Sequence, residues 1–278
     1  MRISTSSLGL LYFSTSVGAS WNAADFKVYV RMYHQLELAR SGEALFRRRG
    51  KFLKYVVILS VVIAYFHGAS GPFVSDKTNM AWFLVSFAIA SAGALVRIVT
   101  GGYAALGTSG SNKKAAIAAE LNTTGPYSLV RNPLYLGRIL NFTGIAMLSG
   151  SWVYGALVFL VSILVYERIS VYEEEFLRKE FEEAHSAWAE QVPFLMPRLR
   201  GWTKPKYPFW VRRSIKRENK KIMWLVVAVV MCDFAQRGFD PAQLPDNLAW
   251  YYIGAVTLLA YMFIRSLYHF TKTFDDVS

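Results

Sequence analysis

Six apolar stretches constrain the fold of this 278-residue chain more than any other feature of its sequence. With 54% hydrophobic and only 18% charged residues, the chain is more apolar than a soluble domain of this size. Several stretches approach the roughly 20 apolar residues that a transmembrane helix needs. We therefore predict an all-α polytopic bundle of about six transmembrane helices, over residues 55–68, 80–100, 134–148, 152–166, 222–234 and 248–270.

Lysine and arginine are distributed unevenly between the connecting segments. Residues 41–54, 101–131 and 166–221 carry 5, 3 and 13 basic residues, whereas 68–79 and 238–248 carry one and none. By the positive-inside rule, this pattern places both termini and the basic segments in the cytoplasm of a bacterial inner membrane or the endoplasmic reticulum. The net charge of +12 then reflects topology and contact with anionic lipids, and we expect no nucleic-acid partner.

The sequence divides into three parts. We expect an N-terminal membrane-associated segment over 1–54, a membrane core over 55–197, and a basic cytosolic segment with two C-terminal transmembrane helices over 198–278. In the first part, residues 8–21 are expected to dip into the membrane and 23–40 to form an amphipathic surface helix. A secretory signal is the alternative for the first stretch, but its apolar core is brief and interrupted by serines.

The numbers and positions of cysteine and histidine limit which redox and metal sites the chain can form. Cys232 is the single cysteine, so an internal disulfide and a Cys-x-x-Cys redox pair are excluded. The four histidines are scattered and show no ligand spacing on one helix, so we predict no metal site.

Two polar motifs flank the short hairpin that we expect over 134–166. The first, over 125–135, reads G-x-Y-x-x-x-R-x-P-x-Y, in which Pro126 fixes a turn and Pro133 suits a first helical position. The second begins with E-E-x-x-L over 173–177 and ends with V-P-x-x-x-P. The predicted topology puts both motifs on the cytosolic side, within reach of a polar cosubstrate. A loop shaped only by its glycine and prolines is the alternative for the first motif.

These motifs, in this order, resemble the isoprenylcysteine carboxyl methyltransferase and phospholipid methyltransferase family over about residues 119–198. The resemblance implies methyl transfer from S-adenosylmethionine within a helical membrane enzyme that has no Rossmann sheet. The glycines at 101–102 and at the two ends of 107–110 agree with the absence of a Rossmann sheet, because they are not set between a strand and a helix. The resemblance implies that the cofactor contacts Leu121, Asn122, Tyr127, Asn132, Pro133, Leu134, Tyr135 and Glu173.

Elementary chemistry is compatible with these assignments. A sulfonium is a cation that the rings of Tyr127 and Tyr135 can attract, and Glu173 can accept a charge-assisted hydrogen bond from the cofactor's amino group. The alternatives are that the tyrosines anchor the chain at the membrane interface and that residues 173–175 form a solvated acidic face.

Two positions depart from the family pattern. Asn132 stands where the family usually has histidine, and an amide cannot titrate, so proton transfer at this position is excluded. Ile169 occupies the place where prenylcysteine enzymes have an arginine. The neighbouring Arg168 shares a helix face with Glu175 rather than with Glu173, which leaves the methyl acceptor open.

The motifs contain no evident base, which favours an acceptor that is anionic at neutral pH. A carboxylate or phosphate on a lipid or lipidated molecule needs only positioning and desolvation to attack an activated methyl carbon. We expect Arg131 and Arg168 to act in catalysis by holding this acceptor, with Arg138 as a further candidate. Arg131 could equally be a residue that snorkels to the membrane edge.

Three alternatives remain open at this point. One is a phospholipid or lipid A phosphate methyltransferase. Another is an NADPH-dependent sterol-type membrane reductase, whose loop also carries arginine, proline and tyrosine, and the third is a non-enzymatic scaffold.

Residues 198–221 mix cations with aromatic side chains, so we expect them to lie along the inner leaflet close to the first motif and to gather an anionic acceptor.

Overall fold

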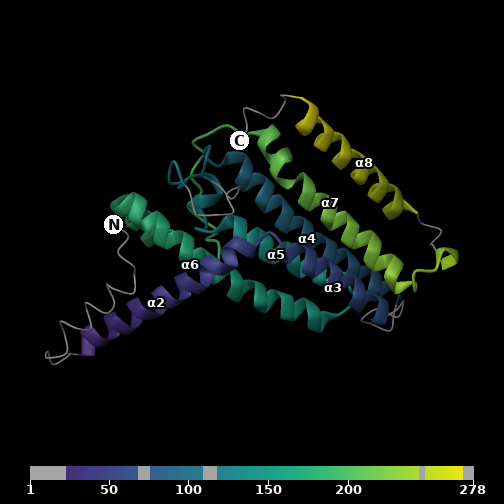
Figure 1. Cartoon of the computed structure of the whole chain (residues 1–278), viewed down its shortest axis with the longest axis horizontal. Coiled ribbons are helices and arrows are strands. Elements are labelled where there is room, and N and C mark those ends of the chain that lie inside the picture. The colour runs from purple at the N-terminus through teal and green to yellow at the C-terminus, as the bar shows by residue number, and fades with distance from the viewer. Residues whose placement is uncertain (1–22, 68–75, 109–117, 244–247, 272–278) are drawn as a thin grey trace.

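The computed structural model describes residues 23–67, 76–108, 118–243 and 248–271, and all regular elements within these ranges are helical. This confirms the predicted all-α class, while the expected membrane dip over 8–21 lies outside the described residues. In chain order (Figure 1) the elements are α2 (Ala23–Arg48), α3 (Phe52–His67), α4 (Asp76–Tyr103), η2 (Gly125–Ser128), α5 (Pro133–Met147), α6 (Trp152–Gln191), α7 (Val211–Gln236), η3 (Pro241–Gln243) and α8 (Ala249–Phe270).

Three of the described helices are long and apolar enough to cross a membrane, namely α4, α6 and α8. The end of α2 and the whole of α3 also qualify together, as a pair bent by 72°. By contrast, the 15 residues of α5 span only about 22 Å, which is shorter than a hydrocarbon core of about 30 Å. The chain is thus an integral membrane protein, and the count of six spans with cytosolic termini stays a prediction.

Helix α5 lies in the middle of the bundle. It packs against α3, α4 and α6, while α7 lies against α3 and α4 (Figure 1). Helix α2 packs on α6, and α8 packs on α7 with none of its described residues buried. Large apolar side chains on α8, such as Val256, Leu259 and Phe263, are exposed, as expected of a helix that faces lipid.

Small residues bring α4 and α5 unusually close together. A Cβ atom added at Gly144 would lie 2.4 Å from the backbone nitrogen of Ala90, and one at Gly137 would lie 2.7 Å from the carbonyl oxygen of Gly93. The Asn141 amide also donates a 2.9 Å hydrogen bond to the Ala90 carbonyl. Close backbone approach through small residues, with a polar side chain bonded across, is a common way for membrane helices to associate.

The short hairpin between α5 and α6 forms as predicted, but α6 continues much further than expected. Gly150 adopts a φ of 84°, and the Ser151 hydroxyl caps α6 by accepting a 3.2 Å hydrogen bond from the Tyr154 backbone. The predicted membrane-spanning stretch ended at residue 166, and the helix continues beyond it because glutamate, alanine and leucine in the next stretch are strong helix formers. The helix therefore runs on to Gln191, with a break at Glu182, where φ is 38°.

The basic stretch 198–221 is not the single surface segment that the sequence suggested. Its first half is irregular, whereas its second half is the beginning of α7. Within that helix, Arg213 and Glu218 are 1% and 4% exposed. Part of the basic charge therefore lies inside the protein rather than among lipid headgroups, because Ser214 and Glu218 bond this part of α7 to α4.

Two glycines of α4 provide a test of the close contact between α4 and α5. Gly93→Ala places a methyl group 2.4 Å from the Asn141 nitrogen, and we expect a loss of about 1–3 kcal/mol of stability from overpacking. Gly101→Ala meets no atom within 4 Å, so it should leave stability unchanged or raise it by up to about 1 kcal/mol. Thermal unfolding in detergent compares the two, and equal melting temperatures would contradict the close contact.

Candidate functional site

The first motif forms a loop that leads into α5, and residues 118–132 are called the motif loop here. Pro133 occupies the first position of α5, where its missing N–H is not needed. Upstream, Gly125 has a φ of 60° and opens the short helix η2, within which the Ser128 hydroxyl donates a 2.7 Å hydrogen bond to the Gly125 carbonyl. The loop is therefore an ordered turn.

Residues 193–207, which we call the strap, hold the motif loop from outside. The Gly125 backbone nitrogen donates to the Thr203 carbonyl at 2.9 Å, and the Thr203 nitrogen donates back to the Ser128 hydroxyl at 3.0 Å. Arg198 bonds the carbonyls of Leu129 and Ser128 through its backbone nitrogen and its Nε atom, both at 3.0 Å. The first half of the basic segment thus lies on the motif loop.

An exposed ion pair fastens the far end of the strap. Lys206 Nζ lies 2.6 Å from Glu120, and the Tyr207 hydroxyl donates to the same carboxylate at 2.5 Å. These hydrogen bonds from Lys206 and Tyr207 lower the pKa of Glu120 below its usual value. Because the pair is exposed, its net contribution to stability is small.

The two sequence motifs meet at Glu174. The Asn132 amide donates to the Glu174 carboxylate at 2.9 Å and to the Phe194 carbonyl at 3.2 Å, and Arg131 Nη1 lies 3.2 Å from the other Glu174 oxygen. The Arg131 guanidinium also lies 5.4 Å from the centre of the Phe194 ring. Asn132 therefore acts as a hydrogen-bond donor that ties the motif loop to α6. The sequence reasoning did not single out Glu174 for this contact.

A cluster of tyrosines surrounds the neighbouring Glu173. The Tyr135 hydroxyl is hydrogen-bonded to the Glu173 carboxylate, which also lies within electrostatic reach of Arg49 and Arg138. The Tyr135 ring stacks on that of Tyr166, with centroids 5.0 Å apart. Tyr166 was not predicted to belong to the site. It ends an apolar stretch, and a tyrosine at such a position usually anchors a chain at the membrane interface.

Tyr127 lies between this cluster and α7. Burial raises the pKa of its hydroxyl above the usual value, and the nearby negative charge of Glu173 raises the pKa further. Arg217 and Arg97 are also close enough to act on this hydroxyl. At physiological pH Tyr127 is thus a neutral hydrogen-bonding group that adjoins both the acidic and the basic side chains of the site. Its carbonyl accepts a 3.1 Å hydrogen bond from Trp188.

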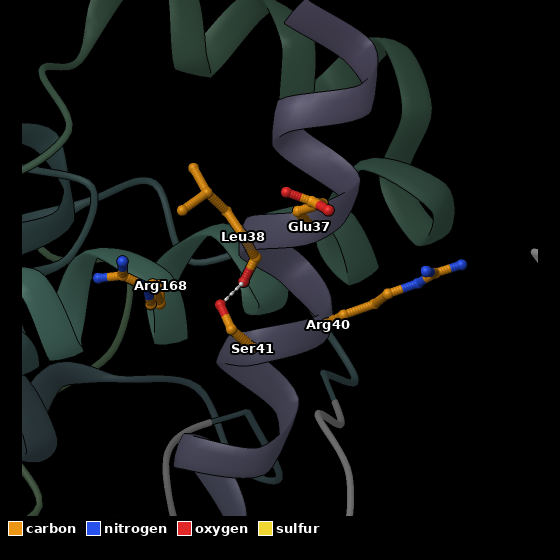
Figure 2. A pocket seen from close by; sticks show the side chains of 5 residues that line it. All are labelled: Glu37, Leu38, Arg40, Ser41 and Arg168. Atoms are coloured by element: carbon orange, nitrogen blue, oxygen red, sulfur yellow. Dashed lines mark hydrogen bonds between the residues drawn. The ribbon is translucent and has the colours of Figure 1, made fainter.

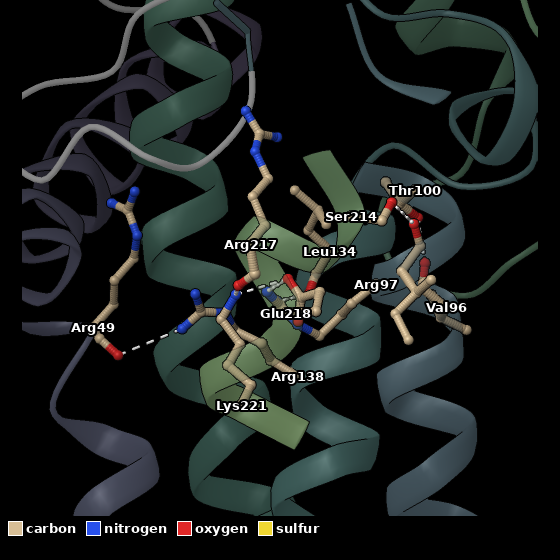
Figure 3. A network of polar contacts seen from close by, with 11 residues as sticks. Arg49, Val96, Arg97, Thr100, Leu134, Arg138, Ser214, Arg217, Glu218 and Lys221 are labelled. Atoms are coloured by element: carbon tan, nitrogen blue, oxygen red, sulfur yellow. Dashed lines mark hydrogen bonds and ion pairs between the residues drawn. The ribbon is translucent and has the colours of Figure 1, made fainter. Parts of the chain in front are cut away.

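A buried ion pair joins α4 and α7 beside the motif loop. Arg97 donates to the Glu218 carboxylate from Nε at 2.9 Å and from Nη2 at 2.7 Å, and Lys221 Nζ lies 2.7 Å from the same group (Figure 3). Arg97 Nη1 also donates to the Leu134 carbonyl at 3.2 Å. The side chains of the ion pair are each 6% exposed. The sequence contained a signal for this pair that was missed, because Arg97 stands inside an apolar stretch. A charged residue at such a position usually has a partner and a function.

The remaining predicted residues lie beside other parts of the chain. Asn122 binds the segment that follows α4, because its amide accepts from the Ala105 nitrogen and donates to the Thr108 hydroxyl, both at 2.8 Å. Leu121 is half-buried beside it. Arg168 donates to the Leu164 carbonyl at 3.0 Å. It lines an open hollow with four residues of α2 (Figure 2), namely Glu37, Leu38, Arg40 and Ser41.

Comparisons with known proteins agree with the predicted family. Residues 83–184 match the family model described as phospholipid methyltransferase, which confirms the resemblance to membrane methyltransferases. The nickel-cobalt-cadmium resistance protein NccN of Alcaligenes xylosoxydans xylosoxydans is 33% identical over 82 residues, which are 30% of this chain and 38% of that protein. The cobalt-zinc-cadmium resistance protein CzcN of Cupriavidus metallidurans is 35% identical over 79 residues, 28% of this chain and 36% of its own length.

The chain thus spans little more than a third of the length of these two relatives. No solved structure matches it. Within the residues that the structure describes, no group of three or more histidine, cysteine, aspartate or glutamate side chains could hold a metal ion.

Adjacent glutamates provide a test of the contact between the motifs. Glu174→Ala removes the partner of Asn132 and Arg131, so we expect the Arg131 amide, which bonds the Pro193 carbonyl at 2.9 Å, to exchange its hydrogen about tenfold faster. Glu175→Ala removes only exposed pairs with Arg178 and a lysine on the same helix and is the matched control. Equal exchange rates in the two variants would show that Glu174 does not hold the loop.

Proposed function

Because residues 83–184 match the phospholipid methyltransferase family, we propose that this chain is a membrane enzyme that transfers a methyl group from S-adenosylmethionine to an anionic membrane substrate. The acceptor is a carboxylate or phosphate of a lipid or lipidated molecule, as in isoprenylcysteine carboxyl methyltransferases. The observation that carries this proposal is the convergence of both motifs on one cluster, formed by Tyr127, Tyr135 and Glu173.

The side chains of this cluster suit the cofactor. Its sulfonium and its amino group are both cationic, and the cluster offers aromatic rings together with a carboxylate. Tyr135 is held in place twice, by stacking on Tyr166 and by its hydrogen bond to Glu173. We assign the sulfonium to the tyrosine rings and the amino group to Glu173. Pro133 and Leu134 supply the helix start that positions Tyr135.

Two of the three remaining cofactor assignments, Asn132 and Asn122, have structural roles as well. Their amide groups bond protein partners, on α6 and on the segment that follows α4. We therefore propose that they shape the motif loop around the cofactor, and that Leu121 covers it from the same side. Arg131 has the same supporting role through Glu174.

Methyl transfer places few chemical demands on the protein. In the transfer, an acceptor oxygen forms a bond to the methyl carbon, the carbon–sulfur bond breaks, and its electron pair stays on sulfur, which becomes neutral. The product is a methyl ester, and no proton has to be removed from an acceptor that is already anionic. The chain's own contribution is to orient the reactants and exclude water, which does not require a titrating residue at Asn132.

Arg168 is assigned a place on the acceptor's path rather than at the reacting atoms. It lines the open hollow between α2 and α6 (Figure 2), which lies on the outside of the bundle. We propose that a lipid-type acceptor passes this hollow on its way from the bilayer to the cytosolic side, where the motif loop lies.

Calorimetric titration of the purified protein with S-adenosylmethionine tests the proposal. We expect binding in the micromolar to millimolar range, weakened about tenfold or more in Tyr135→Ala and Glu173→Ala, because each removes a direct contact. Glu183→Ala, an exposed position on the same helix, is the control and should bind like the wild type.

The same titration with NADPH separates the alternatives. Tight NADPH binding without binding of S-adenosylmethionine would indicate a membrane reductase, and binding of neither would indicate a scaffold. If the cofactor binds, mass spectrometry of membranes from cells with and without the protein identifies the acceptor by its gain of one methyl group.

A further inference from the structure

The strap contains a short turn that is fixed at both ends and exposed between them. Residues 199–202, called the tip here, follow Arg198 and precede Thr203. Arg198 donates to the Leu129 carbonyl through its backbone nitrogen, and Thr203 bonds the motif loop through both its nitrogen and its carbonyl. Both ends of the tip are therefore attached to the motif loop.

The tip is folded around the guanidinium of Arg198. Gly201 adopts a φ of 94°, a conformation that favours glycine, and a Cβ atom added there would lie 2.9 Å from that guanidinium. The guanidinium in turn donates to the carbonyls of Ser128 and Gln191, at 3.0 and 2.8 Å. The backbone of the tip is thus well supported, and its side chains are presented on a rigid turn.

Large apolar side chains stand out from this part of the strap. Leu199 is 97% exposed and Trp202 is 53% exposed, and Met196, just before the tip, is 79% exposed. Single exposed apolar side chains are common on protein surfaces, but several of them gathered in one short segment mark a contact surface. The rigid turn therefore presents apolar groups to a partner that covers them.

The charges of the strap indicate what this partner is. Residues 193–207 contain four cations and neither aspartate nor glutamate. Two of the cations, Arg198 and Lys206, bond the motif loop. Arg200 and Lys204 are exposed, and no carboxylate of the described residues pairs with them. Tryptophan and aliphatic side chains mixed with free cations are typical of segments that lie in the headgroup layer of an anionic leaflet.

The position of the strap in the bundle agrees with a membrane surface. Just beyond the strap, the Trp210 nitrogen donates a 3.0 Å hydrogen bond to the Gly102 carbonyl, in the last turn of α4 (Figure 1). Helix α4 is long and apolar enough to span a membrane, so its end marks the level of the interface. The strap is therefore attached at the level where lipid headgroups meet water.

We propose that the tip, led by Leu199 and Trp202, enters the headgroup layer of an anionic membrane leaflet and thereby holds the motif loop in its cofactor-binding arrangement. The second part of this proposal rests on the proposed function. The strap can transmit the contact because Asn132 of the motif loop also donates to the Phe194 carbonyl, next to the start of α5 that carries Tyr135.

A nitroxide label on the tip tests the membrane contact without any cofactor. Leu199→Cys is labelled in the full-length protein and placed in nanodiscs of phosphatidylcholine, alone or with about a third of phosphatidylglycerol. The chain's own Cys232 is buried, so the labelled wild type is the blank. In the anionic discs we expect the label to collide more often with oxygen, which concentrates in the bilayer, than with a water-soluble nickel chelate. Glu183→Cys, an exposed position on α6, is the control and should favour the nickel chelate.

Two results would contradict the membrane contact. If the label on the tip favours the nickel chelate as strongly as the label at position 183, the tip stays in water and a protein partner covers it instead. If the label on the tip favours oxygen equally in neutral and anionic discs, the assignment to an anionic leaflet is overturned.

Titration with S-adenosylmethionine in the same nanodiscs tests the effect on the motif loop. We expect the wild type to bind about threefold or more tightly in anionic discs, because a larger fraction of the protein then has a binding-competent loop. The double variant Arg200→Gln and Lys204→Gln should lose this difference. The double variant Lys51→Gln and Lys220→Gln removes the same charge from exposed positions outside the strap and should keep it.

The two experiments separate this proposal from the proposed function. Equal affinity of the wild type in neutral and anionic discs would overturn the link between the tip and the motif loop. Failure of S-adenosylmethionine to bind in either kind of disc would overturn the proposed function, whereas the label on the tip reports the membrane contact in either case.

Discussion

The arrangement of the bundle depends on the guanidinium of Arg97, which lies inside a helix that is long and apolar enough to span a membrane. A charge at this place is tolerated only when it is paired and its N–H groups are satisfied. The structure meets this requirement with Glu218 of α7 and the Leu134 carbonyl at the start of α5. One side chain thereby fixes three helices relative to one another at the level of the motif loop.

The motif loop is fixed from three further directions. Glu174 binds it to α6, Asn122 binds it to the segment that follows α4, and the strap covers it through Thr203 and Arg198. Such fixation reduces the entropy that is lost when a ligand is bound, because the groups that contact it are already ordered. The tyrosines of the site are consequently presented on a rigid support, although they lie on or next to a loop.

The sequence was sufficient for local features and for the pairing of the two motifs, but not for contacts between distant segments. Apolar runs gave the helices of the core, and the serines around Gly150 gave the hairpin. The pairing of Arg97 with Glu218 joins residues 121 positions apart, and no local pattern records it. The sequence predicted that residues 198–221 lie close to the first motif, but it did not reveal the bonds of the strap to the loop, several of which join backbone atoms that every sequence possesses.

The predicted roles of the arginines illustrate a second limit. Helical periodicity predicted that Arg168 and Glu173 lie on different helix faces, and in the structure Arg168 lines a hollow with residues of α2. Periodicity within one helix could not reveal that Arg138 of α5 and Arg217 of α7 both lie within electrostatic reach of Arg97, because these residues belong to three different helices.

The polar side chains around the motif loop are divided between the residues that match the family and α7. The tyrosines and Glu173, proposed to hold the methyl donor, all lie within residues 83–184, whereas Arg217, Glu218 and Lys221 lie on α7 beyond that match. Among the residues of α7, Glu218 matters most for the fold, because its loss would leave the Arg97 guanidinium without its carboxylate inside the bundle and would weaken the contact between α7 and α4. The support of the candidate site therefore extends beyond the residues that match the family.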